Sequence, residues 1–346
     1  MHPIDLRSDT VTLPTNEMLE AISKAELGDD VFQEDPTVNK LEHLAAKTFN
    51  KESAIFMPSG TMANLVAVLT HCQRGDEVIL GDQSHTFLYE AGGISSFGGV
   101  HSRQIKNYDD GTMRLEDIKN SVRKKDVHFP PSRLVCLENT HNRCFGMPLD
   151  INYINKVSEI VKNNSMMLHV DGARIFNAAA ALNKSVAELT SEVDSVSFCL
   201  SKGLSAPSGS LLCGKKEFIE KARFNRKALG GGMRQSGILA ATGIVALNEM
   251  PKKIIKDHQN ASTLAKGLNA ISGISIDLEK VKTNIIYFKL NHSKIDSVTL
   301  INSMLKKNIK FFELGPNWFR LVTHAGINEE DIEHVLIQFK DLFSKI

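Results

Sequence analysis

Ser197-Phe198-Cys199-Leu200-Ser201-Lys202-Gly203 is a short apolar run that ends in a lysine between small residues. The run is typical of a buried strand, and a lysine seldom lies at the end of such a strand without a partner or a task. Burial favours the neutral amine, which can form an imine with a carbonyl compound. A lysine that merely extends its ammonium group from the strand end into water explains this segment alone equally well.

A second segment of the same kind is Leu168-His169-Val170-Asp171-Gly172-Ala173-Arg174, in which a carboxylate follows an apolar run. If both runs are parallel strands, Asp171 and Lys202 lie at the carboxyl edge of one sheet, where open α/β folds bind ligands. An enzyme that uses pyridoxal phosphate (PLP) needs an acid there to keep the pyridine nitrogen protonated. Taken alone, Asp171 is better explained as a helix cap. Together, Asp171 and Lys202 are far more specific for PLP than either residue.

Apolar runs of strand length alternate with runs of helix length over the first 250 residues. The predicted strands are residues 54–57, 78–80, 134–137, 166–170, 196–200 and 210–213. With helices between several of them, this order predicts an α/β domain whose largely parallel sheet is covered by helices. After Pro251, predicted helices at 254–271, 296–306 and 329–343 alternate with short strands and indicate a smaller α+β domain. The predicted domains are therefore 1–249, N-terminal arm included, and 250–346.

Pro58-Ser59-Gly60-Thr61-Met62-Ala63-Asn64 joins the end of a predicted strand to the start of a predicted helix. Free N–H groups and the positive end of the helix dipole would face an anion there, and the Ser59 and Thr61 hydroxyls can add hydrogen bonds. The segment matches neither the dinucleotide fingerprint nor the P-loop, which disfavours a dehydrogenase. Turns of this composition are common, so the segment predicts a phosphate cradle only in combination with Lys202 and Asp171.

Histidines and arginines supply the remaining candidates. His85 comes just after a predicted strand, where it can stack on a cofactor ring or transfer a proton, and His128 lies between elements in a similar way. Arg320, inside an apolar run, and Arg174 are candidates for binding a substrate carboxylate, because a planar guanidinium can donate two parallel hydrogen bonds to it. A structural salt bridge is the competing interpretation of Arg320.

Composition and charge exclude several other classes of function. The 346 residues are 42% hydrophobic and 23% charged, and a formal net charge of +1 gives no electrostatic reason for a nucleic-acid or membrane partner. The five cysteines match neither a CxxC nor a zinc pattern, so no metal is predicted. No apolar run approaches the roughly 20 residues of a membrane span, and residues 1–5 carry no signal-peptide features. We therefore expect a cytoplasmic enzyme.

Taken together, these segments resemble the threonine aldolases, a family of the aspartate-aminotransferase-type (fold type I) PLP enzymes. The more distinctive parts are RSDTVT at residues 7–12 and GGGMRQ at residues 230–235. The matching segments, in order, are residues 5–12, 28–31, 58–61, 137–142, 169–174, 200–203, 230–237 and 320–324. The resemblance implies a large domain around a mostly parallel seven-stranded sheet and a small C-terminal α+β domain.

The resemblance also implies roles for individual residues. Lys202 forms the internal aldimine with PLP, Asp171 contacts the pyridine nitrogen, and Arg234 reaches the phosphate from a neighbouring subunit of a dimer-based homo-oligomer, a tetramer. His128 resembles the second active-site histidine, near the β-hydroxyl of the substrate. The implied cofactor-binding residues are Ser59, Gly60, Thr61, His85, Asp171, Arg174, Lys202 and Arg234. The implied substrate-carboxylate residues are Ser8, Arg174 and Arg320.

The implied reaction is retro-aldol cleavage of the Cα–Cβ bond of L-threonine or L-allo-threonine, which yields glycine and an aldehyde. Three groups can serve as the base that removes the β-hydroxyl proton: His85, His128 and a water held between them. The residues do not choose among the three. Another reaction on the same scaffold, β-elimination or transamination, also remains open. A non-catalytic binding protein is disfavoured, because it has no need of the lysine and acid pair, Lys202 and Asp171.

Overall fold

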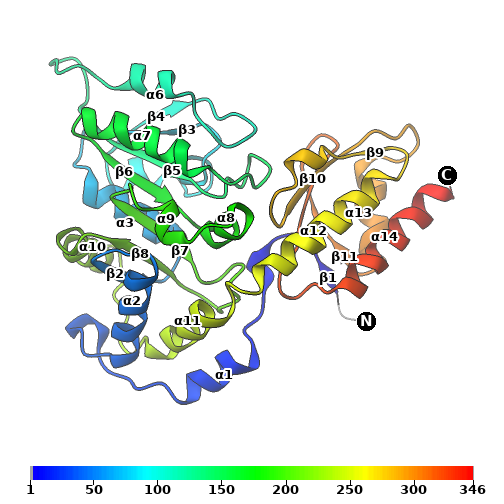
Figure 1. The fold of residues 1–346 in the computed structure, drawn as a ribbon, viewed down its shortest axis with the longest axis horizontal. Coiled ribbons are helices and arrows are strands. Elements are labelled where there is room, and N and C mark those ends of the chain that lie inside the picture. The colour runs from blue at the N-terminus through cyan, green and yellow to red at the C-terminus, as the bar shows by residue number, and fades with distance from the viewer. Residues whose placement is uncertain (1–2, 346) are drawn as a thin grey trace.

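The computed structural model describes residues 3–345, which form a larger layered body and a smaller one (Figure 1). In the larger body a central sheet lies between helices, and the smaller body holds the C-terminal helices and strands. Met1, His2 and Ile346, which the predicted domain ranges and the N-terminal prediction include, lie outside the described residues.

The central sheet has seven strands in the order β2-β8-β7-β6-β5-β3-β4. Strand β8 runs antiparallel to both of its neighbours, and the remaining neighbours pair in parallel. The predicted seven-stranded, mostly parallel sheet is thereby confirmed. Its strands are β2 (Ser53–Met57), β3 (Glu77–Gly81), β4 (His101–Ile105), β5 (Ser132–Glu138), β6 (Met167–Asp171), β7 (Ser195–Cys199) and β8 (Ser210–Gly214).

Side chains alternate between two apolar cores, one on each face of this sheet. On β3, Ile79 packs in one core, whereas Val78 and Leu80 pack in another, as the two-residue period of a strand dictates. The core with Ile79 includes α2 (Pro36–Thr48), α6 (Leu115–Ser121), α7 (Ile151–Asn163), α8 (Ile175–Leu182) and α11 (Gly237–Glu249). The opposite face is covered by α3 (Gly60–His71), α5 (Gly93–Ser96) and α10 (Lys216–Ala228). Two short helices, α4 (His85–Leu88) and α9 (Val186–Leu189), follow β3 and α8 along the chain.

The smaller body is built on an antiparallel four-stranded sheet in the order β12-β13-β10-β9. In its core the rings of Phe288 and Phe319 stack with centroids 4.8 Å apart, and Phe339 meets Phe288 edge-on. The predicted small α+β domain is confirmed. Its elements are α12 (Ile254–Asn269), β9 (Ile274–Ser275), β10 (Ile285–Leu290), α13 (Ser297–Leu305), β11 (Ile309–Lys310), β12 (Phe312–Gly315), β13 (Trp318–Val322) and α14 (Glu329–Ser344).

The N-terminal arm belongs to both bodies. Strand β1 (Ile4–Asp5) pairs in parallel with β11, and Ile4 and Leu6 are buried in the core of the smaller body. The chain then crosses to the larger body, where α1 (Asn16–Ser23) packs against α11. The predicted ranges 1–249 and 250–346 assigned the whole arm to the large domain, whereas these two apolar side chains are buried beside β11. The pairing could not be expected from the sequence, because a two-residue strand carries no periodic signal.

All five cysteines are free and buried. Within residues 3–345, no helix combines the length and the apolar character that crossing a bilayer requires.

Candidate active site

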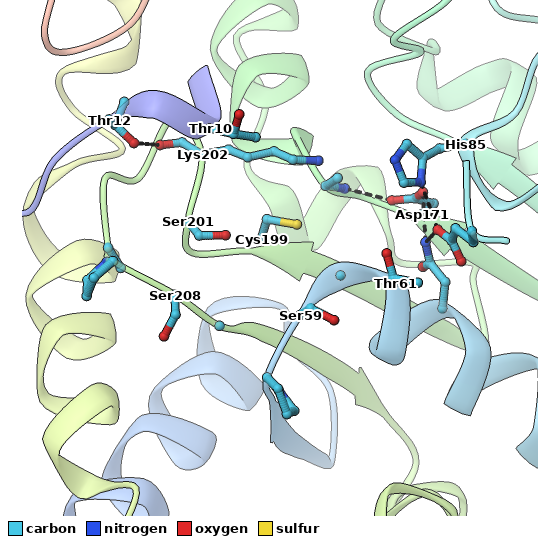
Figure 2. A pocket seen from close by; sticks show the side chains of 18 residues that line it. Thr10, Thr12, Ser59, Thr61, His85, Asp171, Cys199, Ser201, Lys202 and Ser208 are labelled. Carbon is cyan, nitrogen blue, oxygen red and sulfur yellow. Dashed lines mark hydrogen bonds and ion pairs between the residues drawn. The ribbon is translucent and has the colours of Figure 1, made fainter. Parts of the chain in front are cut away.

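A cavity of about 380 Å³ opens at the carboxyl ends of strands β6 and β7. Its wall combines the turn between β2 and α3, the segment that links β7 to β8, and Thr10 and Thr12 of the N-terminal arm (Figure 2). Asp171 ends β6 and Lys202 follows β7, so the structure brings these two predicted residues to the same edge of the sheet. The sheet-edge argument made from the sequence alone therefore holds for both.

Lys202 and Asp171 face each other across this cavity. The Lys202 side chain runs toward the side that holds Asp171 and His85 (Figure 2). The backbone oxygen of Lys202 accepts a hydrogen bond from Thr12 Oγ1 at 3.1 Å, which ties the segment after β7 to the N-terminal arm. The Asp171 carboxylate is only 4% exposed and accepts from Asn64 Nδ2 at 2.9 Å and from the Ala173 N–H at 3.0 Å. Both hydrogen bonds are donated to the carboxylate and fix its position at the cavity wall.

The predicted phosphate cradle lies at the N-terminus of α3. Ser59 is the N-cap of this 12-residue helix, and its hydroxyl accepts from the Met62 N–H at 3.2 Å. A Cβ atom on Gly60 would come within 2.8 Å of Cys199 Sγ, so a larger residue cannot take this place without a shift. Ser208 also lines the cavity, and its buried hydroxyl has no hydrogen-bond partner among residues 3–345. A buried hydroxyl without a partner is uncommon and suits a ligand with acceptor oxygens.

His85 is the first residue of α4 and lines the same cavity. Its backbone N–H donates to Glu138 Oε2 at 2.7 Å, and its ring Nδ1 lies 2.8 Å from Glu90 Oε1. Burial opposes protonation of the ring, but the hydrogen bond with Glu90 and the charge of Asp171 outweigh it and raise the pKa of His85. The protein thus holds an imidazole with increased proton affinity at the cavity wall.

A second cluster of charged groups lies next to this cavity, connected to it through Asp9 and Thr10. Arg174 Nε and Nη2 each donate to an oxygen of Asp9 at 2.7 Å, and both side chains are buried. Burial opposes ionisation of Asp9, but the charge of Arg174 outweighs it and lowers the pKa of Asp9. Arg320 Nη1 donates to Asn142 Oδ1 at 2.8 Å, whereas its buried Nε has no partner among the described residues. Burial and the charge of Arg174 lower the pKa of Arg320.

This cluster carries two guanidinium groups against one carboxylate, so it presents excess positive charge to an incoming anion. Ser8, the third residue predicted here, accepts from the Thr10 N–H at 3.2 Å and caps the short turn that contains Asp9. Arg174 lies in this cluster and not in the lining of the first cavity, where a cofactor contact was also predicted for it.

Two predicted residues lie outside both groups in the single chain. His128 is 80% exposed, in the segment between α6 and β5, and pairs with Asp126 at 2.7 Å. Arg234 is 54% exposed, just before α11, and donates to Asp29 Oδ2 at 2.9 Å. Their predicted roles therefore remain predictions that require another chain or a different arrangement of these segments.

The structure adds five residues that sequence reasoning missed. Asp9 lies inside the RSDTVT segment and could have been found there. Asn64 is one helical turn beyond the cradle, a position typical of residues that face the same site. No sequence signal pointed to the others. The five are Asp9, Asn64, Glu90, Asn142 and Ser208.

Comparison with known proteins agrees with this geometry. Residues 5–291 match the family model for the β-eliminating lyases. The chain is 48% identical over 344 residues to a protein of Arabidopsis thaliana named probable low-specificity L-threonine aldolase 2, covering 98% of this chain and 97% of that one. Among solved structures, Leishmania major threonine aldolase superposes with a TM-score of 0.84 at 19% identity, covering 99% and 100% of the two chains. The PLP internal-aldimine form of SPT superposes with a TM-score of 0.77 at 18% identity, covering 98% and 87%, so both share the fold.

Proposed function

The chain belongs to the β-eliminating lyase family, and from this membership we propose that it is a PLP-dependent threonine aldolase of low specificity. It cleaves L-threonine and L-allo-threonine at the Cα–Cβ bond to glycine and acetaldehyde. The observation that carries the proposal is the meeting of Lys202, Asp171 and the cradle at Gly60 around one cavity, in a chain similar over nearly its whole length to a threonine aldolase.

The residues around the cavity fit PLP. Lys202 offers an amine for its aldehyde, and Asp171 is a buried carboxylate for its pyridinium nitrogen. Ser59, Gly60 and Thr61 would hold the phosphate at the helix N-terminus, and the unsatisfied Ser208 hydroxyl supports an acceptor-rich group at this place. When bound, PLP supplies the sink for the electron pair that the broken Cα–Cβ bond releases.

The second cluster orients the substrate. Arg320 and Arg174, with Ser8 beside them, would bind the substrate carboxylate, because one carboxylate, Asp9, leaves their combined charge uncompensated. Fixing this carboxylate fixes rotation about the Cα–N bond. The Cα–Cβ bond can then be held perpendicular to the cofactor ring, which selects it for cleavage. Positioning of this kind supplies several kcal/mol of barrier reduction, on the order of 7 kcal/mol or more in the best cases.

The proton of the β-hydroxyl must pass to a base as the bond breaks. His85 is the histidine in the cavity lining, and its raised pKa increases its affinity for this proton. His128, or a water between the two rings, can take the same role only if the exposed segment that carries His128 reaches the cavity. His85 is therefore the base that the single chain supports best.

The site is completed in a homo-oligomer, a dimer-based tetramer. Arg234 is exposed at the surface of its own chain, and it would reach the phosphate of a neighbouring subunit. Large apolar side chains are exposed along the N-terminal arm and the segment after it, as expected of a face that another subunit covers. They are Leu13, Leu19, Leu27 and Phe32.

Product analysis tests the proposal. The purified, PLP-loaded protein is given L-threonine or L-allo-threonine, and aldehyde and glycine are measured. We expect equal amounts of the two products, slower reaction of serine and no cleavage of alanine, and we expect Lys202→Ala to lose both turnover and the visible absorption of bound PLP. If neither threonine isomer yields aldehyde while another amino acid gives a keto acid, the activity is β-elimination or transamination instead.

A further inference from the structure

Glu90 is a buried carboxylate beside the cavity. It is 5% exposed, and its Oε1 atom accepts from Asn64 Nδ2 at 2.8 Å and lies 2.8 Å from His85 Nδ1. Its second oxygen, Oε2, is buried and has no hydrogen-bond partner among residues 3–345. Directly after it, Ala91 has φ +53° and Gly92 has φ +64°. A non-glycine residue in this region is uncommon and strained, so the turn is held where it directs Glu90 inward.

The contact with Glu90 decides which nitrogen of His85 carries the proton. An imidazole nitrogen has an ordinary pKa of about 6.5 and a glutamate one of about 4.3. Burial raises the pKa of Glu90, against the hydrogen bonds from His85 and Asn64, and the pKa of His85 is raised as well. Because Glu90 Oε1 already accepts from Asn64 Nδ2, we place the proton between the two groups on Nδ1. In the neutral ring this leaves Nε2 without a hydrogen and able to accept one. A carboxylate that fixes the tautomer of a histidine and stabilises its protonated form is the arrangement found in the Ser-His-Asp triads.

Asn64 connects this pair to the cofactor carboxylate. Its Nδ2 donates both to Glu90 Oε1 and to Asp171 Oδ2, at 2.8 Å and 2.9 Å. Its Oδ1 accepts from Ser197 Oγ at 2.7 Å and lies 3.2 Å from His169 Nε2. The Asn64 oxygen faces the serine and the histidine, and the Asn64 nitrogen donates to the two carboxylates. Only this orientation of the amide satisfies all four neighbours, because a carboxylate cannot donate to an amide oxygen. Two carboxylates are thus kept side by side by one shared amide group.

We propose that Glu90 is the positioning residue of His85, holding its ring in the Nδ1–H tautomer so that Nε2 accepts the β-hydroxyl proton of the substrate. The proposal rests on the aldolase function proposed above, and it selects His85 Nε2 from the possible bases. In the step itself, the proton moves from the β-oxygen to Nε2 while the Cα–Cβ bond breaks, the β-carbon becomes an aldehyde, and the released electron pair passes to the cofactor. Glu90 takes no proton and balances the charge of the imidazolium.

The charges around His85 give a pH dependence. Glu90 and Asp171 face its ring as anions, and Glu138 binds its backbone N–H. The charge of Lys202 opposes them in the chain without a cofactor, and its amine would be taken up by PLP in the loaded enzyme. The two anions prevail, so the pKa of His85 is raised. Below that pKa, Nε2 already carries a proton and cannot act as the base. Cleavage therefore falls as the pH drops through the pKa of His85.

The first test observes the ring directly, without reference to turnover. The PLP-loaded enzyme is labelled with ¹⁵N-histidine, and the His85 signals are assigned with His85→Gln. We expect the Nδ1–H tautomer and titration above the ordinary value of about 6.5. An Nε2–H tautomer, or titration at or below that value, would overturn the proposal even in a chain that proves not to cleave threonine.

The second test uses kinetics. Glu90→Gln preserves the shape of the side chain but removes its charge, so the acid limb of kcat/KM should move down by about one pH unit or more. The plateau should fall about tenfold to a hundredfold, because the tautomer is no longer fixed. Glu188→Gln, which removes a charge from the exposed α9 pair with Lys184, should change neither.

A double-mutant cycle separates positioning from a general structural effect. In a His85→Gln background, adding Glu90→Gln should cost no further activity, because Glu90 acts through the ring that is already missing. If the two losses multiply, Glu90 acts elsewhere and the proposal fails. Visible absorption of bound PLP, compared across all variants, identifies any loss that arises from Asp171 and the cofactor instead.

Discussion

Arg320 is the residue whose role is easiest to separate from folding. It donates to Asn142 Oδ1 and to the Arg7 backbone oxygen, and its buried Nε has no hydrogen-bond partner within residues 3–345. We expect Arg320→Ala to raise the KM for threonine about tenfold to a hundredfold, since a charged hydrogen bond contributes roughly 1.5–3 kcal/mol. Bound PLP should remain, which its absorption spectrum reports.

Arg320→Lys provides the matched comparison. It preserves the charge and loses the planar fork, so its KM should lie between those of the wild type and the alanine variant. An unchanged KM together with a lower melting temperature in both variants would show that Arg320 is a structural ion-pairing residue.

At the scale of single residues, the sequence was sufficient to predict the site residues that follow the end of a strand. Lys202, Asp171, His85 and the cradle at Gly60 were all predicted, and all line one cavity. Glu90 was not predicted, because its contact with His85 arises from a turn whose direction no residue pattern encodes. The roles of the exposed His128 and Arg234 are still predictions.

Helix α3 shows how an element forms part of a binding site. Its first residue is Gly60, and a Cβ there would lie 2.8 Å from Cys199 Sγ. Gly60→Ala should therefore push the helix N-terminus away from β7 and weaken PLP binding, by about tenfold if the shift costs one hydrogen bond of the phosphate. The dissociation constant is measured by titrating the apoenzyme with PLP.

The double variant Gly60→Ala/Cys199→Ala removes the atom that the new methyl group would meet. Its PLP affinity should recover toward that of Cys199→Ala alone. If the double variant binds PLP as weakly as Gly60→Ala does, the loss is due to the helix backbone and not to the contact with sulfur.

Helix α12 carries an acid that makes stability depend on pH. Burial and the charge of Asp9 raise the pKa of Asp257 to about 7, from an ordinary value of about 3.9. The folded chain thus binds this proton more tightly than the unfolded chain, so the contribution is complete below pH ~4 and is lost as pH rises through 7. Asp257→Asn should therefore stabilise the protein at pH 8 more than at pH 5, by roughly 2–3 kcal/mol, because part of the cost is already present at pH 5.

Thermal unfolding midpoints at the two pH values measure this difference. Asp341→Asn, an exposed change on α14, should shift the midpoint equally at both. If Asp257→Asn destabilises the protein equally at pH 5 and pH 8, the amide disrupts packing. Ionisation of Asp257 then has no cost to the stability of the folded chain.

Most elements were predicted within two or three residues, since their apolar periods are strong. Strands β1, β4 and β12 and helices α4, α5, α9 and α10 were not predicted, and two of them show why. β4 is an edge strand that reads HSRQI, with only Ile105 buried, and α10 is largely charged, with Ile219, Ala222 and Arg226 as its buried residues. Both are stabilised by what they pack against, which a local pattern does not contain.

At the scale of the whole molecule, the proposed assembly can be tested by mixing inactive chains. If Arg234 serves the neighbouring site, a dimer of one Lys202→Ala chain and one Arg234→Ala chain contains one site in which both residues are native. Each such hybrid dimer should then show about half of the wild-type activity, because one of its two sites is native. Activity is measured after co-expression of two differently tagged chains and purification through both tags.

Each variant paired with itself provides the control and should stay inactive. If the hybrids are no more active than these controls, Arg234 acts only in the site of its own chain. An active monomer in sedimentation would exclude a shared site.

The architecture itself was predicted, because alternating strand and helix patterns admit few arrangements. The parallel sheet and the small C-terminal domain followed from them. The path of the N-terminal arm did not follow from them, since Ile4 and Leu6 pack in the core of the smaller body, some 300 residues away in sequence.

That crossing has a consequence for synthesis of the protein on the ribosome. Ile309, the partner of Ile4 in β11, is made 305 residues after it. At about 5–20 residues per second, the N-terminal strand waits about 15–60 s for the segment it must join. The larger body can collapse during translation, but the smaller one closes only after β11 has left the tunnel. Until then Ile4 and Leu6 are open to chaperones, and a nascent chain that stalls before residue 309 cannot bury them beside β11.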